Sequence, residues 1–451
     1  MKVRTSHVGL ARMEHSCRIL PEPDMSTAAD TASNDANPSG EQTSTWRAPT
    51  TAGPRILRQI LSLDDFEAPA RRYLPRPIFG YIVSGADTNV SIRANRAAYD
   101  DLAFLPDVLV GTAQRMQKTT IFGHTYDSPF GFSPMGGVSI AAYQGDLVLA
   151  RAAAQANIPM ILSGAALTTL EAVREVGPTT WFQAYLPGET EPIRRLIDRV
   201  TRAGYDTLVL TVDVPVASNL EIGVRSGFRK PFQPGLRLAW DGITRPRWLF
   251  GMFFRTLLLH GMPHVENMTS PRSPMISLGG TRERGQLDKL SWSHLELIRR
   301  LWKGNLVVKG ILNKANARRV RECGADGIIV SNHGGRQLDG SASPLRVLAG
   351  IAAEAGKMTV MTDSTVRRGT DVLKALGLGA KFVFIGRPIL YAAAIAGQAG
   401  VNHAVKLLRD EIHRDMALLG INSLAEMTRE RLIEVRGFDG ATLQSRAGGP
   451  E

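Results

Sequence analysis

Short apolar runs alternate with amphipathic segments through most of the chain. From about residue 56 onward, eight apolar runs bounded by glycines or polar caps predict eight strands. They are FGFSP (130–134), MILSG (160–164), WFQAY (181–185), LVLTVD (208–213), LVVKG (306–310), IIVSN (328–332), VMTD (360–363) and FVFIG (382–386). Between most of them lies one helical pattern, at 146–157, 169–176, 192–203, 294–302, 315–323, 345–355 and 369–378.

Regular alternation of strands and helices with short connections implies parallel pairing of the strands. Eight such units imply closure into an α/β (β/α)8 TIM barrel, and a doubly wound open sheet is the alternative. The alternation breaks once, where about 80 residues separate the fourth strand from the next helix, and a connection this long in a compact domain is usually functional. We therefore expect one barrel domain at 53–435, with an insertion at about 222–291.

The two ends of the chain differ in composition from the barrel region. Residues 1–52 are rich in Ser, Thr, Ala, Asp, Asn and Pro, which predicts a disordered polar leader, and residues 436–451 are expected to form a flexible tail. No apolar run reaches the roughly 18 residues of a membrane span. The two cysteines, Cys17 and Cys323, lack metal-ligand spacing, which favours a reducing, cytoplasmic compartment and no metal site.

The chain is basic, with a formal net charge of +12. Such a charge is compatible with acidic substrates, an anionic membrane surface or nucleic acid. Blocks of like charge and interleaved aromatic and basic residues are missing from the sequence, so we expect no nucleic-acid partner.

Polar residues cluster where the predicted strands end, and the active sites of TIM barrels form at these carboxyl ends. A purely structural layer would consist of Val, Ile and Leu. Instead the strand ends carry Pro134, Met135, Gly136, Ser163, Gln183, Tyr185, Thr211, Asp213, Lys309, His333, Arg336, Asp363, Gly386 and Arg387.

Two chemical subsets separate within this group. Arg367, Gly386 and Arg387 follow strands seven and eight, where barrel loops commonly hold a phosphate. Lys309, Gln183 and Thr211 are polar partners for a flat heterocycle near the barrel centre. His333 with Asp363 is an imidazole beside a carboxylate, which suits a general base, and Arg336 offers a fork for a substrate carboxylate.

Several motifs resemble, in family order, the FMN-dependent 2-hydroxy acid oxidase and dehydrogenase family, which includes glycolate oxidase, lactate oxidase and mandelate dehydrogenase. They span about Leu57 to Met427 and read LPRPIFGYIVSGAD, FQAYL, LTVDVP, LVVKGIL, SNHGGRQLDG and RRGTDVLKALGLGAKFVFIGRP. The resemblance implies FMN as cofactor, oxidation of an L-2-hydroxy acid to the 2-oxo acid, oxygen or a quinone as electron acceptor, and a homotetramer.

The resemblance also implies a role for each site residue. His333 would take a proton from the substrate with Asp363 as its partner, and Arg336, Tyr81 and Tyr185 would hold the carboxylate or developing carbonyl. Lys309 would stabilise the reduced flavin. The remaining residues would contact the flavin ring or its phosphate: Pro134, Met135, Gly136, Ser163, Gln183, Thr211, Ser331, Ser364, Arg367, Gly386 and Arg387.

Three positions depart from the family pattern. Leu220 stands where the family carries the second Arg of GRRE, and Thr365 stands where DGG or DSG ends in glycine. Ala165 replaces a bulky aromatic residue found in glycolate oxidase. Leu220 predicts weaker anchoring of the substrate carboxylate, and Thr365 predicts a shift of the flavin phosphate. Leu220 and Ala165 together predict a larger, more apolar pocket. The alternative readings are a catalytically weakened FMN-binding barrel, or another FMN barrel enzyme such as a type 2 isopentenyl-diphosphate isomerase.

The long insertion contains an apolar and basic segment, RPRWLFGMFFRTLLLHGMPH, at 245–264. The preferred interpretation is burial against protein, either over the active site or in a tetramer interface. The alternative is peripheral contact with an anionic membrane surface, at the inner face of the membrane.

Overall fold

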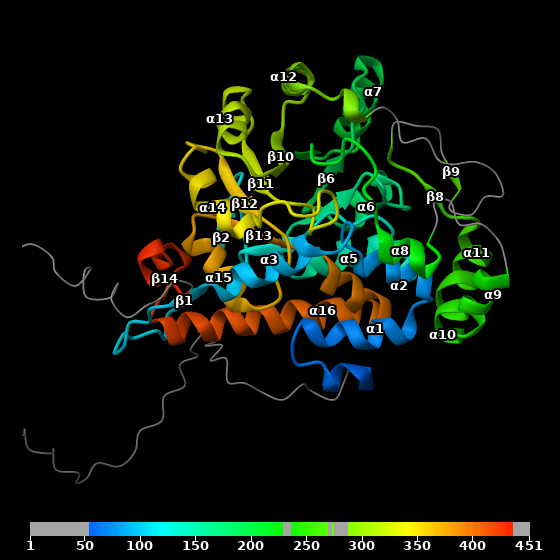
Figure 1. The fold of residues 1–451 in the computed structure, drawn as a ribbon, viewed down its shortest axis with the longest axis horizontal. Helices are drawn as coiled ribbons and strands as arrows, with labels where there is room; N and C mark the ends of the chain where they lie inside the picture. Colours follow the sequence, from blue (N-terminus) through cyan, green and yellow to red (C-terminus); the bar gives the residue numbers. More distant parts are fainter. Residues whose placement is uncertain (1–53, 229–235, 269–272, 275–286, 436–451) are drawn as a thin grey trace, which may run out of the picture. The chain divides into compact units, whose positions relative to one another are not determined.

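The computed structural model describes residues 54–228, 236–268, 273–274 and 287–435, so the expected leader and tail lie outside the described residues. Eight parallel strands close into a barrel (Figure 1). They are β4 (Phe130–Phe132), β5 (Met160–Ser163), β6 (Thr180–Ala184), β7 (Thr207–Thr211), β10 (Asn305–Ile311), β11 (Gly327–Val330), β12 (Thr359–Thr362) and β13 (Phe382–Ile385). The predicted TIM barrel is confirmed, and the open sheet is excluded because β13 pairs with β4.

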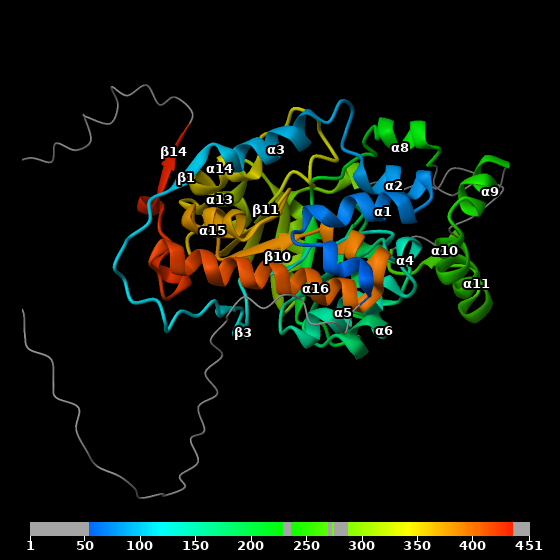
Figure 2. The same ribbon diagram turned by 90° about the horizontal axis from the view of Figure 1, so that it is seen from below.

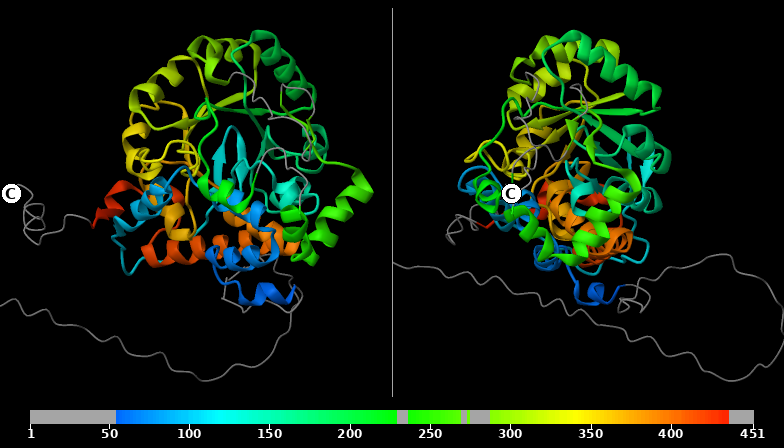
Figure 3. Two further views of the ribbon diagram at one scale, coloured as in Figure 1. Left: turned by 45° about the vertical axis from the view of Figure 1, so that its right-hand side comes forward. Right: turned by 90° about the vertical axis from the view of Figure 1, so that its right-hand side faces the viewer.

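Helices form a ring outside the strands, as Figure 3 shows. The seven predicted helices are all present, each within about three residues of its expected ends, and α16 follows the last strand. Their bounds are α5 (Gly145–Gln155), α6 (Leu170–Val176), α7 (Thr190–Arg202), α12 (Trp292–Leu301), α13 (Lys314–Glu322), α14 (Pro344–Ala352), α15 (Gly369–Gly377) and α16 (Arg387–Leu419).

The inside of the barrel has an apolar layer and a polar layer. Side chains two residues apart on a strand point to the same face. On each of six neighbouring strands an apolar residue of the inner core is followed two residues later by a polar one, and these pairs are Ile161 and Ser163, Trp181 and Gln183, Val209 and Thr211, Val307 and Lys309, Ile329 and Ser331, and Met361 and Asp363. The polar layer therefore lies at the carboxyl ends, directly above the apolar core.

Segments before and after the barrel support its two ends. The hairpin β2 (Thr119–Ile121) and β3 (His124–Tyr126) adds Ile121 and Tyr126 to the inner apolar core, which closes the amino-terminal end. Helices α1 (Glu67–Tyr73), α2 (Arg76–Val83) and α3 (Val90–Asp100) precede the barrel, and α3 packs against α14 (Figure 2). Strand β1 (Leu102–Phe104) pairs with β14 (Leu432–Glu434).

The connection from β7 to α12 carries its own helices. They are α8 (Glu221–Ser226), α9 (Leu236–Ile243), α10 (Pro246–Trp248), a π-helix (Leu249–Phe254) and α11 (Arg255–His260), followed by a short pair of strands, β8 (His264–Val265) and β9 (Ser273–Pro274). Figures 1 and 2 place α9 to α11 at the edge of the molecule. Among the described helices, none combines the length and apolar character needed to cross a bilayer.

Candidate active site

One cavity of about 740 Å³ lies at the carboxyl ends of the strands. Most of the predicted site residues line it: Tyr81, Pro134, Met135, Gly136, Tyr185, Lys309, His333, Arg336, Asp363, Ser364, Arg367, Gly386 and Arg387. Ser163, Gln183, Thr211 and Ser331 are not lining residues, and their side chains belong to the buried polar layer at the same strand ends.

Lys309 and Asp363 form a buried ion pair at the base of the cavity. The Lys309 ammonium lies 3.2 Å from the Asp363 carboxylate, and both side chains are almost fully buried. Lys309 also donates to Ser331 Oγ at 2.8 Å, and Ser364 Oγ donates to Asp363 at 2.9 Å. A buried charge needs such compensation, so the pair fixes both groups in place.

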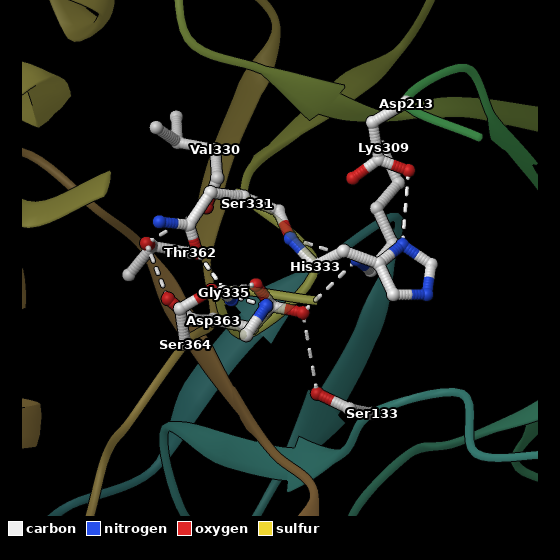
Figure 4. Close-up of polar contacts among 12 residues, drawn as sticks. Ser133, Asp213, Lys309, Val330, Ser331, His333, Gly335, Thr362, Asp363 and Ser364 are labelled. Carbon is white, nitrogen blue, oxygen red and sulfur yellow. Dashed lines mark hydrogen bonds and ion pairs between the residues drawn. The ribbon is translucent and has the colours of Figure 1, made fainter. Parts of the chain in front are cut away.

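The partner of His333 is Asp213, and the expected pairing with Asp363 is wrong. His333 Nδ1 lies 3.0 Å from Asp213 Oδ1, whereas Asp363 is paired with Lys309 (Figure 4). Burial alone would raise the pKa of the Asp213 carboxyl, but the neighbouring His333 and Lys309 hold this pKa below its ordinary value. An ionised Asp213 favours a proton on Nδ1, which leaves Nε2 of His333 as the basic nitrogen.

A glycine explains how Asp213 reaches His333 across an intervening strand. Asp213 follows β7 and His333 follows β11, and β10 lies between them. At Gly310 the β10–β11 register shifts and φ is +108°. A Cβ added there would lie 2.6 Å from the Asp213 Cβ. The missing side chain therefore provides the space that the Asp213 carboxylate occupies.

Arg336 is held at the end of helix α2. Its Nη1 donates to the main-chain carbonyls of Tyr81, Ile82 and Ser84 at 2.9, 3.1 and 2.8 Å, and the guanidinium lies over the Tyr81 ring. Nε and Nη2 of Arg336 make no hydrogen bond to the described residues. These two nitrogens can form the fork that binds a carboxylate.

The polar layer fits the ring of a flavin. Gln183 Nε2 and Thr211 Oγ1 are buried and have no hydrogen-bond partner among the described residues. They lie on the adjacent strands β6 and β7, and the Gln183 oxygen already accepts from Ser163 Oγ and the Gly164 amide. A buried donor without a partner is unfavourable, and a polar heterocycle would satisfy both groups.

The opposite wall of the cavity fits a phosphate. Arg367, Gly386 and Arg387 line it together, and Arg387 donates to the carbonyls of Ile82, Ser84 and Gly334. Burial, followed by the positive charge of the nearby Arg336, lowers the pKa of Arg387 to about 9. Because a guanidinium keeps its proton in proteins, Arg387 stays cationic beside Arg336. A phosphate would supply the missing negative charge.

The loop after β12 keeps a glycine-like backbone without glycine. Ser364 has φ +83° and Thr365 has φ +65°, both in the left-handed region. Such a conformation costs roughly 1 to 2 kcal/mol for a residue with a Cβ. Ser364 Oγ partly offsets this cost, because it accepts from the Gly334 amide at 3.1 Å while it donates to Asp363. Thr365 therefore adopts a left-handed conformation of the kind that glycine takes without strain.

Leu220 and Ala165 both line the cavity, together with Val216, Met268 and other apolar residues. Arg225, which could have replaced the missing guanidinium, turns away: it pairs with Glu221 at 2.5 Å and its side chain is 75% exposed. Met268 and Leu287 of the long connection reach the cavity, whereas none of the lining residues comes from 236–260. The expectation that the 245–264 segment covers the active site is therefore not met.

Comparison with known proteins identifies the family of the chain. The model of the FMN-dependent dehydrogenase family matches residues 70–434. (S)-Mandelate dehydrogenase of Pseudomonas putida is 34% identical over 379 residues, covering 84% of this chain and 95% of that protein. L-Lactate oxidase of a Nostoc species is 37% identical over 374 residues, covering 81% and 96%.

The fold matches solved structures as well. A crystal structure of the monotopic membrane protein (S)-mandelate dehydrogenase superposes with a TM-score of 0.77 at 34% identity, covering 83% of this chain and all of that one. The chain belongs to the FMN-dependent dehydrogenase family, and it is an FMN-dependent enzyme that oxidises 2-hydroxy acids to 2-oxo acids.

Proposed function

We propose that the protein oxidises an L-2-hydroxy acid whose side chain is larger and more apolar than that of lactate. In this proposal Nε2 of His333 takes a proton from the substrate. Asp213 holds the imidazole in one orientation and stabilises its protonated form. Arg336, with Tyr81 and Tyr185, binds the carboxylate, and all three residues line the cavity.

FMN, when bound, would supply the acceptor for the two electrons that the oxidation removes from the substrate. We assign its ring to Gln183, Thr211 and Lys309, because the first two carry unpartnered buried donors and the third is a buried cation. Its phosphate is assigned to the wall formed by Arg367 and Arg387. Lys309 stabilises negative charge on the ring, while Asp363 fixes the ammonium in place.

The apolar character of the cavity at Leu220 carries the substrate assignment. A hydrogen bond to a charged group contributes about 1.5 to 3 kcal/mol, so the missing guanidinium weakens the binding of any small acid by about ten- to a hundredfold. Each buried methylene returns about 0.8 kcal/mol, so about three more methylenes than lactate offset most of this loss. Small acids such as glycolate and lactate have too little apolar surface to recover this lost binding free energy.

The proposal is tested by anaerobic reduction of the yellow holoenzyme with a matched series of acids. We expect loss of absorbance near 450 nm with (S)-mandelate and 2-hydroxyhexanoate at concentrations about ten- to a hundredfold below those that lactate needs. A protein that stays oxidised with every acid would be an FMN-binding barrel without this activity. A preference for glycolate would contradict the assignment of the pocket.

Leu220→Arg is expected to reverse the preference. The new guanidinium should raise kcat/KM for lactate by about ten- to a hundredfold and lower it for mandelate and 2-hydroxyhexanoate. Val216→Arg is the matched control, because Val216 also lines the cavity but is largely exposed at its rim. If both variants change both substrate classes equally, the effect is general electrostatic attraction and the assignment of Leu220 is wrong.

A second proposal concerns the helices α9 to α11. Their exposed surface carries large apolar side chains, among them Leu236 (92% exposed), Trp240 and Leu258 (81%), beside Arg247 and Arg255. Trp248 anchors the segment, since it is buried and donates to the Ile140 carbonyl at 2.9 Å. Exposed apolar residues flanked by arginines suit peripheral binding to an anionic membrane surface, with a quinone as electron acceptor. The similarity to a monotopic membrane protein supports this proposal.

Substitution of Trp240, Leu258 and Leu259 by serine is expected to abolish co-sedimentation with vesicles containing phosphatidylglycerol while leaving flavin reduction intact. The exposed residues Leu61 and Leu418 provide the control pair, since their serine variants should still bind. Binding should fall with ionic strength. If the wild type does not co-sediment with vesicles, but forms an oligomer that the triple variant lacks, the surface is a subunit interface instead.

A further inference from the structure

Helix α3 bonds two different loops of the active site through consecutive residues. Asn95 contacts the loop after β11, which carries His333. Arg96 contacts Asp371 in the first turn of α15, directly after the loop that carries Arg367. Neither residue lines the cavity. Consecutive residues on a helix point about 100° apart, so one helix can reach both loops at once.

Asn95 holds the loop on both sides of His333. Its side chain exchanges two hydrogen bonds with Asn332, at 2.9 and 2.8 Å, and both residues are almost completely buried. Asn332 Oδ1 also accepts from the Gly335 amide at 3.0 Å. His333, Gly334 and Gly335 have φ values of +58°, +66° and +72°. Three successive left-handed residues need external support, and the Asn95–Asn332 pair supplies it.

Two further contacts press the same loop onto α3. Asp339 caps the start of the helix and accepts from the Val90 and Ser91 amides at 3.2 and 2.8 Å. A Cβ at Gly335 would lie 2.8 Å from the Ile92 nitrogen, so the loop backbone lies directly against the helix.

Arg96 holds the phosphate wall through one carboxylate. Its guanidinium makes a bidentate pair with Asp371 at 2.6 and 2.9 Å, and Asp371 is almost completely buried. Oδ2 of Asp371 also accepts from the main-chain amides of Arg367 and Arg368 at 2.8 and 3.1 Å. Arg96 therefore fixes the carboxylate that shapes the backbone at Arg367.

We propose that Asn95 and Arg96 are positioning residues with separate targets: Asn95 sets the position of His333, and Arg96 sets the phosphate wall. The inference rests on the proposed roles of His333 and Arg367. Loss of Asn95 displaces the base relative to the substrate, and a misplacement of about 1 Å can lower a rate about a hundredfold. Loss of Arg96 loosens the backbone around the phosphate, and this lowers the affinity of the protein for the cofactor.

The test compares Asn95→Ala with Arg96→Met in two assays. Asn95→Ala should lower kcat by about ten- to a hundredfold and change the FMN dissociation constant less than about threefold. Arg96→Met should raise the FMN dissociation constant by at least about tenfold, with a smaller effect on kcat at saturating FMN. FMN binding is read from the quenching of its fluorescence, and kcat from single-turnover flavin reduction.

Matched controls separate positioning from general stability. Asn305→Ala removes an amide at the opposite end of the barrel, and Arg346→Met removes another arginine bonded at the end of α3, through Asp101. Both should leave kcat and FMN binding near wild type. Asn95→Ser keeps a small, neutral polar group beside Asn332 and should fall between wild type and Asn95→Ala, which also covers the case in which Asn95→Ala does not fold.

Parallel losses of FMN binding and kcat in both variants would overturn the inference, as would an Asn95→Ala enzyme with wild-type kcat. Hydrogen exchange at 331–343 gives a readout that needs no activity, and it should be faster in Asn95→Ala than in Arg96→Met. An inactive wild type would refute the proposed function. If the wild type is active and the Asn95 variants have the kcat of the wild type, only this inference is refuted.

Discussion

Replacing His333 with alanine is expected to lower the rate of flavin reduction by about a hundredfold to ten-thousandfold, the scale of general base catalysis. His333 lines the cavity, and its Nδ1 is bonded to Asp213, so Nε2 is the nitrogen that can accept a proton. The variant should retain FMN, because the groups assigned to the flavin ring and phosphate lie on other strands and loops. Stopped-flow absorbance near 450 nm measures the loss directly.

The controls for this variant are a second substitution and the FMN content of each protein. His333→Gln preserves a polar side chain of similar size, and it should be as slow as His333→Ala if the loss is that of a base. Equal FMN content in wild type and both variants would rule out a cofactor defect. Flavin reduction at the wild-type rate in either variant would show that His333 is not the base.

The fold was predictable because its signals are local. Each strand is an apolar run between polar caps, and each outer helix has one apolar face. The periodicity of apolar residues along the chain was therefore enough to locate the strands and helices. The polar layer was predictable for the same reason: Thr211, Lys309, Ser331 and Asp363 stand two residues beyond buried apolar positions of their strands. Strand adjacency in a parallel barrel then brings these side chains together.

The pairing within that layer was not predictable. Asp363 ends the strand next to that of His333, so adjacency favoured it as the partner. The outcome depends on Gly310, where a shifted register and a missing Cβ give Asp213 room to cross β10. Asp363 is meanwhile occupied by Lys309. Which carboxylate meets which cation depends on distances of a few ångströms between strands, and sequence spacing does not encode these.

The position of the apolar segment at 245–264 also depended on tertiary structure. Its composition indicated contact with an apolar surface. The same residues, however, suit burial over the active site and exposure at an edge, so composition could not distinguish the two placements. Trp248 and Met252 are buried against the barrel, whereas Leu258 and Leu259 are exposed. Residues of one short segment thus have opposite environments. The direction of the helices determines which of them are buried and which are exposed.

Asp213→Asn is expected to slow flavin reduction by on the order of a hundredfold, because the neutral amide neither stabilises a protonated His333 nor selects the tautomer with a basic Nε2. The same substitution at Asp363 should act differently. It leaves the buried Lys309 ammonium without its counter-charge, so Asp363→Asn should lower the free energy of unfolding by about 3 to 5 kcal/mol. Thermal or urea unfolding measures this loss.

A double-mutant cycle then identifies the partner of the base. If Asp213 acts through His333, the rate of His333→Ala/Asp213→Asn should equal that of His333→Ala alone, because the carboxylate has nothing left to orient. Asp363 is bonded to Lys309 instead, so any rate loss in Asp363→Asn should multiply with that of His333→Ala. Multiplying effects for Asp213 together with a saturating effect for Asp363 would reverse the assignment and restore Asp363 as the partner of the base.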